Sequence, residues 1–135
     1  MPFRTIRAMR ARRGFTLIEL LIVILVLAIL MAVALPLYLA AVSDSQVKTC
    51  RANMQSISNA EAAYKTSIAT HVYTTTLTDL NSNLGATPVC PSGGTYSVTI
   101  GSGTANNGTA VQAGGLLVAC SFAGHGVFAP GIDSQ

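Results

Sequence analysis

Charged residues are scarce in this sequence and unevenly placed. They make up 10% of the 135 residues, and five of the eight basic ones precede Gly14. Without residues 1–14, three basic side chains stand against five acidic ones, so the formal charge changes from +3 to −2 (three minus five). No basic face for binding phosphate backbones is left, and we expect no nucleic-acid partner.

Catalytic motifs are also missing. The sequence has no glycine-rich phosphate loop, no nucleophile elbow and no paired-carboxylate arrangement. Cys90, Cys120 and His125 are imaginable zinc ligands, but they lack the close-set ligand pairs of structural zinc sites, and oxidised cysteines cannot bind metal. We therefore predict that the protein is no enzyme, needs no cofactor and has no metal site.

The longest stretch without charge is the apolar run at residues 20–41, which has 22 residues. As a helix it would extend roughly 33 Å, enough for one bilayer crossing. Arginines precede the run and almost none follow it, which predicts a cytoplasmic N-terminus. The 94 residues from Val42 onward then lie outside the cytoplasmic membrane and suffice for one small domain.

Two simpler explanations of the run are a secretory signal peptide cleaved after Ala41 and a plain single-span anchor. The apolar region of a signal peptide has about 7 to 15 residues, fewer than are present here. Neither explanation accounts for Glu19, a carboxylate at the rim of the run. An ionisable group at a membrane segment indicates a functional role by default.

Residues 12–20 read RRGFTLIEL, and with the apolar run behind them they resemble the type IV prepilin signal. Type IV pilins, type II secretion pseudopilins and competence pseudopilins share this signal. The resemblance implies that a prepilin peptidase cleaves after Gly14, that Phe15 becomes an N-methylated N-terminus, and that Glu19 is the assembly carboxylate. Pro36 matches a helix-interrupting proline of many pilins, whereas Ala28 stands where many have a helix-loosening glycine.

Glu19 has no lysine or arginine near it to neutralise its charge. Cleavage before Phe15 would create one cation close by, the α-amine, four residues away. This amine could pair with Glu19 of the same chain or, in a bundle of helices, with Glu19 of a neighbouring subunit. The resemblance favours the second arrangement.

Apolar residues continue at three- and four-residue steps beyond the run, which predicts one long helix over residues 15–69 with a kink at Pro36. The first half, residues 15–41, is apolar all round and is the predicted transmembrane or filament-core helix. The second half, residues 42–69, is amphipathic and belongs to the exported head. Its apolar stripe comprises Val47, Cys50, Met54, Ile57, Tyr64 and Ile68.

The rest of the head, which extends over residues 42–135, is expected to be a loop (70–94), a small antiparallel sheet (95–121) and a C-terminal tail (122–135). Residues 76–80 resemble a capped short helix or a turn. Strands are predicted at 95–100, near 109–112 and at 116–121, with a hairpin turn at 106–108. Tyr96, Val98, Ile100, Val118 and either Leu116 or Leu117 are expected to pack on the helix, giving an α+β fold with a helical spine and a β head.

The three cysteines, Cys50, Cys90 and Cys120, suit an exported domain with one disulfide bond and one cysteine left over. Cys50 lies on the apolar stripe, where a small buried side chain is expected. Cys90 and Cys120 flank the sheet and enclose 29 residues. Closing that loop would contribute roughly 3 to 4 kcal/mol. We predict the Cys90–Cys120 bond, and bonds to Cys50 are the alternatives.

The resemblance implies a structural subunit of a type IV pilus-like filament. Its implied partners are other pilin subunits, a prepilin peptidase, an inner-membrane assembly platform with its ATPase, and membrane lipid before assembly. It would be a single-pass membrane protein with its head in the periplasm or at the cell surface, and part of a filament after assembly. The alternatives are a pseudopilin of a secretion or competence system, and a minor tip subunit that acts as a binding or adhesion module.

Overall fold

The computed structural model describes residues 14–133, so most of the predicted basic leader (1–14) lies outside the described part of the chain. The chain divides into two compact units near residue 39. The N-terminal unit consists, in its described part, of three residues that precede a helix and the first half of that helix. The second unit is the head, which contains the rest of the helix and the following elements.

Helix α1 comprises Leu17–Ser67, which confirms the long helix predicted from the sequence to within two residues at either end. Leucine, isoleucine, valine and alanine dominate its first half and leave no polar face. In its second half one stripe is buried, and the buried residues of the helix are Cys50, Met54, Ile57, Ser58, Ala60 and Glu61. Helix periodicity therefore places the predicted stripe on the head side.

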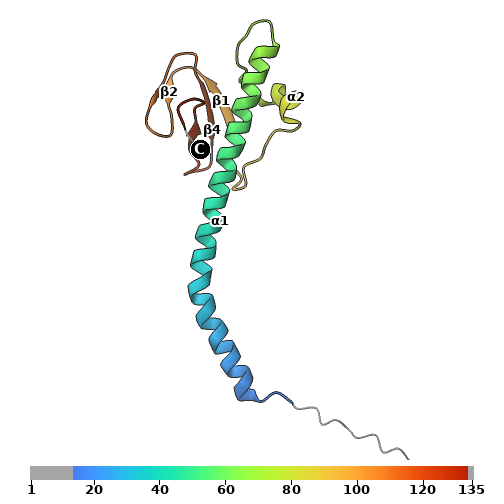
Figure 1. Ribbon diagram of the computed structural model, residues 1–135, viewed down its shortest axis with the longest axis vertical. Helices are drawn as coiled ribbons and strands as arrows, with labels where there is room; N and C mark the ends of the chain where they lie inside the picture. Colours follow the sequence, from blue (N-terminus) through green and yellow to red (C-terminus); the bar gives the residue numbers. More distant parts are fainter. Residues whose placement is uncertain (1–13, 134–135) are drawn as a thin grey trace, which may run out of the picture. The chain divides into compact units, whose positions relative to one another are not determined.

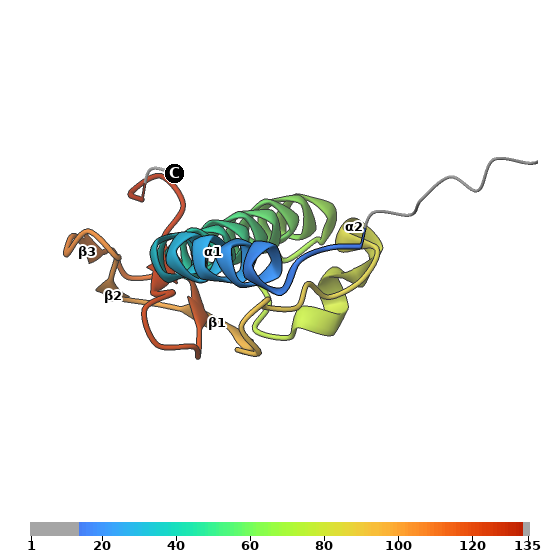
Figure 2. The same ribbon diagram turned by 90° about the horizontal axis from the view of Figure 1, so that it is seen from below.

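The strands of the head form two antiparallel sheets. The larger sheet has the order β1 (Tyr96–Ile100), β4 (Leu116–Cys120) and β5 (Val127–Phe128), with Val98 opposite Val118 and Val118 opposite Phe128. The smaller one pairs β2 (Gly103–Thr104) with β3 (Ala110–Val111). The β2–β3 hairpin and helix α2 (Asn81–Leu84) lie on opposite sides of α1 (Figures 1 and 2).

The predicted strands at 95–100 and 116–121 are confirmed as β1 and β4, and the hairpin turn at 106–108 joins β2 to β3. Two details differ. Residues 127–128, placed in the predicted tail, form β5 because β4 offers them an open edge for backbone hydrogen bonds. Ile100 was expected to pack on the helix but is 39% exposed, because it stands at the last position of β1.

The larger sheet is buried on both faces. Leu116 and Val118 join Tyr96 and Val98 in the core against α1, together with Met54 and Ile57. Leu117 points to the other face and packs with Ala105, Val111 and Ala129, which come from the hairpin and the C-terminal segment. Of the two leucines left open by the sequence, Leu116 is therefore the one that faces the helix. This packing holds the strand ends close to α1.

Residues 77–84 form the short 3-10 helix η1 (Leu77–Leu80) followed by α2, in agreement with the helix or turn predicted at 76–80. Leu80 is fully buried and anchors this segment in the core. Thr76 precedes η1 but makes no side-chain capping bond. Instead the hydroxyl of Thr74 donates to Asp79 and accepts from the backbone N–H of Thr76.

Candidate functional site

The Gly14–Phe15 junction lies just before α1 and is fully accessible. Phe15 is 80% exposed, and a Cβ atom added at Gly14 would meet nothing within 4 Å. No packed side chain covers the peptide bond between them in the described part of the chain. The junction is therefore open to a peptidase, and glycine at this position is not required by packing in the fold.

Thr16 caps the start of α1. The backbone N–H of Glu19 donates to the Thr16 hydroxyl over 3.3 Å, and the N–H of Leu20 donates to the Thr16 carbonyl over 3.3 Å. A threonine followed three residues later by glutamate is the order of a capping box. Glu19 thus sits in the first turn of α1, where the helix dipole favours a negative charge.

The surface that follows Glu19 is apolar around the whole helix. From Leu17 to Leu39 every large hydrophobic side chain is at least 47% exposed. By length and composition α1 is long and apolar enough to cross a membrane, and its most apolar window is not buried within the structure. Exposed apolar surface of this extent normally marks a membrane or protein contact. Pro36 lies inside this segment, and α1 continues through it as a helix.

Residues 9–35 match the family model of the prokaryotic N-terminal methylation motif. The chain carries a prepilin-type signal. This motif is the signature of type IV pilins and pseudopilins, which are structural proteins and not an enzyme family. Together with the long apolar helix, it fits a single-pass, membrane-anchored protein. No curated protein and no solved structure matches the chain.

The prepilin-type signal includes Gly14, Phe15 and Glu19, which the structure places together at the start of α1. Cleavage after Gly14, methylation of Phe15 and an assembly role of Glu19 remain predictions, as does a kink at Pro36. The motif extends into the exposed apolar surface and ends one residue before that proline.

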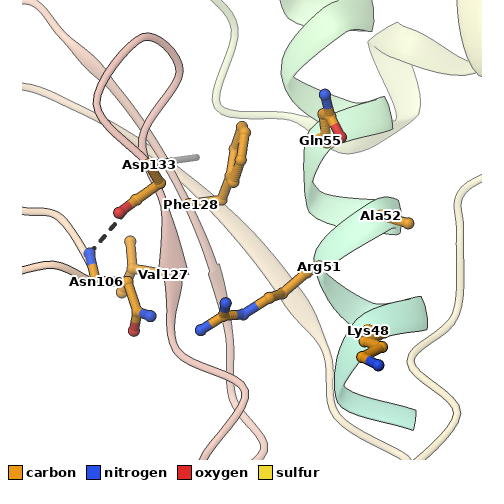
Figure 3. A pocket seen from close by; sticks show the side chains of 8 residues that line it. All are labelled: Lys48, Arg51, Ala52, Gln55, Asn106, Val127, Phe128 and Asp133. Atoms are coloured by element: carbon orange, nitrogen blue, oxygen red, sulfur yellow. Dashed lines mark hydrogen bonds between the residues drawn. The ribbon is translucent and has the colours of Figure 1, made fainter. Parts of the chain in front are cut away.

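The head has a groove of about 380 Å³ between α1 and β5 (Figure 3). Arg51 extends from the helix toward Val127, and Lys48 lies one turn earlier. On the opposite side Asp133 accepts hydrogen bonds from the backbone N–H groups of Asn106 and Ala129. Asp133 therefore ties the C-terminal segment to the hairpin, and the helix side of the groove suits an acidic group.

Cys50, Cys90 and Cys120 lie side by side at the centre of the head, and all three are free thiols. Burial raises the pKa of Cys50 to about 12, although a hydrogen bond from Tyr96 opposes the shift. Burial acts in the same direction on Cys90, but hydrogen bonds from the backbone N–H groups of Ser92 and Gly94 outweigh it and lower the pKa. The predicted Cys90–Cys120 disulfide is thus sterically within reach and remains a prediction.

Glu61 is the one buried carboxylate in the described part of α1. It is fully buried, and its Oε2 accepts a 3.1 Å hydrogen bond from the backbone N–H of Thr74, whereas Oε1 has no partner. Burial raises the pKa of Glu61 above its ordinary value of 4.5, and the bond from Thr74 opposes the shift only in part. Glu61 was read from the sequence as the one polar member of the apolar stripe.

Sequence reasoning did not find the partnership of Cys50 and His125 with the other two cysteines. The stripe correctly places Cys50 in the core, where it is fully buried. His125 lies in the predicted tail yet is only 3% exposed. The available signal was the pair of residues around it, because Gly124 and Gly126 both have positive φ and shape a tight loop.

Proposed function

We propose that the protein is a structural subunit of a type IV pilus-like filament, assembled through the N-terminal half of α1. The observation that carries this proposal is the prepilin-type signal at residues 9–35, followed by a helix whose apolar surface is exposed on every side. Such a helix is stable in a bilayer and equally stable in a bundle of like helices. It can therefore be stored in the membrane and transferred to a filament without exposing apolar surface to water.

Glu19 gives this transfer its register. Cleavage after Gly14 would leave an α-amine on Phe15, and the first turn of α1 presents the Glu19 carboxylate nearby. In the low dielectric of a helix bundle, the amine of one subunit pairs with Glu19 of the next. Desolvation offsets much of the attraction, so the pair specifies the position of an entering subunit more than it adds stability.

The processing partner in this proposal is a prepilin peptidase, and the later partners are like subunits and an assembly platform with its ATPase. The N-terminus lies in the cytoplasm and the head outside the membrane, as the arginines before residue 14 favour. A pseudopilin of a secretion or competence system would use the same segment in a shorter filament.

The test is the mass of the mature chain combined with shearing of the cells. We expect a chain that begins at Phe15 and carries one extra methyl group, recovered as an abundant protein in the sheared surface fraction. The correct N-terminus with no protein in that fraction would indicate a pseudopilin. A mature N-terminus at Val42 would refute the proposal, because the protein would then be an ordinary secreted one.

Substitution of Gly14 gives a matched pair of variants for the processing step. Gly14→Leu should leave full-length precursor in the membrane, because a peptidase cleft that accepts glycine has no space for a large side chain. Gly14→Ala adds one methyl group and should be processed at least in part. Neither substitution meets any atom of the folded chain, so a difference between them reports on processing alone.

A further inference from the structure

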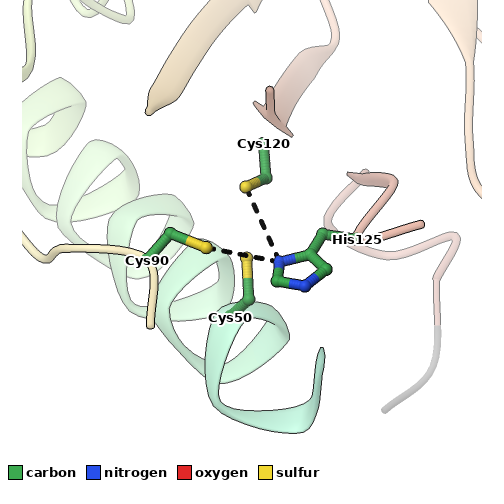
Figure 4. A group of neighbouring side chains, drawn as sticks. All are labelled: Cys50, Cys90, Cys120 and His125. Atoms are coloured by element: carbon green, nitrogen blue, oxygen red, sulfur yellow. Dashed lines mark hydrogen bonds between the residues drawn. The ribbon is translucent and has the colours of Figure 1, made fainter. Parts of the chain in front are cut away.

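Four side chains from distant parts of the sequence point toward one another in the head (Figure 4). Cys50 comes from α1, Cys90 from the loop before β1, Cys120 from the end of β4, and His125 from the loop between β4 and β5. Each offers one ligand atom, and these four atoms all lie within 4.8 Å of one another. Cys50, Cys90 and His125 are at most 3% exposed, and Cys120 is half-buried.

The separations match those in a tetrahedral zinc site. With Zn–S bonds of about 2.3 Å and Zn–N bonds of about 2.0 Å, two sulfurs stand about 3.8 Å apart and a sulfur and a nitrogen about 3.5 Å apart. In the head, Nδ1 of His125 lies 3.3 Å from Sγ of Cys90 and 3.8 Å from Sγ of Cys120. The four atoms therefore surround a space of the size that one zinc ion needs.

We propose that Cys50, Cys90, Cys120 and His125 bind one Zn²⁺ ion in a closed structural site. Three cysteines and one histidine are a common ligand set for structural zinc, and soft sulfur donors select zinc over the oxygen-preferring cations. The ion joins α1 to the loop before β1, to β4 and to the β4–β5 loop. It thereby fastens the helix to the sheet in a head too small to have a large core.

The surroundings of His125 assign the tautomer that a zinc ligand requires. Its Nε2 lies 3.4 Å from the hydroxyl of Ser92, which donates in turn to Oε1 of Gln46 over 3.2 Å. Because the Ser92 hydroxyl gives its proton to Gln46, it accepts from Nε2–H. Nδ1 is then unprotonated and presents its lone pair to the sulfurs, an arrangement that outer hydrogen bonds commonly enforce in metal-binding histidines.

The sulfurs also have donors suited to thiolates. Sγ of Cys90 accepts hydrogen bonds from the backbone N–H groups of Ser92 and Gly94. Sγ of Cys50 accepts from the Tyr96 hydroxyl over 3.4 Å. Three thiolates and a zinc ion carry one net negative charge, and these donors offset the cost of burying it.

A Cys90–Cys120 disulfide is the competing state of the same residues. It would leave the Cys50 thiol over and would give no reason for Nδ1 of His125 to face the sulfurs. Exported proteins commonly form disulfides, so the two states must be separated by experiment. Zinc needs all three thiols reduced, and the disulfide consumes two of them, so one chain cannot hold both.

The first measurement uses the full chain, purified in detergent without added reductant or metal. We expect one zinc per chain by elemental mass spectrometry, and thiols that resist alkylation until a chelator is added. Exchange with Co²⁺ should produce the visible absorption of a tetrahedral site and a thiolate-to-metal charge-transfer band. A metal-free chain with a Cys90–Cys120 linked peptide would overturn the proposal, and so would a metal-free chain with three reactive thiols.

Variants then test the ligand set. Cys50→Ser should abolish zinc binding, whereas it would leave a Cys90–Cys120 disulfide untouched. His125→Asn should also lose the metal, and His71→Asn is its control, because His71 is exposed and bonds only to a backbone carbonyl, that of Lys65. Ser92→Ala should keep zinc with roughly 10- to 100-fold lower affinity. Unchanged zinc content in both Cys50→Ser and His125→Asn would refute the proposed site, even where the wild-type chain binds zinc elsewhere.

Discussion

Replacing Glu19 with valine should separate membrane insertion from filament assembly. The substitution removes the one carboxylate at the rim of the apolar helix, so insertion should be unchanged or improved. Processing after Gly14 should also continue. The yield of filaments should fall sharply, because an entering subunit would bury its α-amine without a carboxylate to meet it.

The size of the effect follows from the charges that the structure places near the helix start. The Phe15 amine is four residues from Glu19, and the next basic residue after Glu19 is Lys48, 29 residues further along the chain. No other charge on the described part of the helix can take the place of Glu19 near the amine. Removing one partner of a buried ion pair costs about 3 to 5 kcal/mol. Addition of a subunit should therefore weaken by roughly 100- to 1,000-fold.

The capping role of Glu19 must be separated from its charge. Thr16→Ala removes the side chain that accepts from the Glu19 N–H and should cost the helix end about 1 kcal/mol. It leaves the carboxylate in place, so filament yield should decrease little. Glu19→Gln preserves size and capping geometry but not the negative charge, and it should assemble as poorly as Glu19→Val.

The assay compares each variant in the sheared filament fraction with the same variant in membranes, so that differences in expression cancel. Assembly of Glu19→Val at the wild-type ratio would refute the reasoning, since the carboxylate would then be incidental. A loss in Thr16→Ala equal to that in Glu19→Val would assign the effect to helix capping and not to charge pairing.

Three further substitutions test the head. Met54→Ala empties a fully buried position and should lower the free energy of unfolding by about 2 to 5 kcal/mol, measured by denaturant titration in detergent, with processing unchanged. For Glu61, the folded state holds its proton more tightly than the unfolded chain, so its contribution to stability declines as pH rises above 4.5; Glu61→Gln should flatten the fall of Tm with pH, and parallel Tm curves would contradict this. Gly94→Ala would place a Cβ atom 2.7 Å from Sγ of Cys120 and 2.9 Å from Cβ of Phe122, and should destabilise the head by about 1 to 3 kcal/mol; an unchanged Tm would show that β4 can yield there.

Much of the fold was predictable because its signals are local. The 51 residues of α1 follow from an apolar run and a stripe at helical spacing, and β1 and β4 follow from short apolar segments between turns. The two residues of β5 have no pattern of their own. They become a strand only because β4 presents an unpaired edge beside them.

The choice between Leu116 and Leu117 shows the same limit. Adjacent residues of a strand point to opposite faces, and both are apolar here, so the sequence leaves open which one meets the helix. The register of β4 against β1 places Leu116 toward α1 and Leu117 toward the hairpin. Both faces of this sheet are covered, which removes the alternation that would have settled the matter.

The sequence by itself determined the parts of this protein whose residues are contiguous: the prepilin-type signal, the apolar helix behind it and the placement of Glu19 at its first turn. A signal read by a peptidase or a bilayer acts on an extended stretch of chain and needs no folded neighbour. Only the tertiary structure decided that Cys50 and His125, 75 positions apart, share one cluster with Cys90 and Cys120. Their spacing carries no ligand motif, because the packing of the sheet on α1 brings them together.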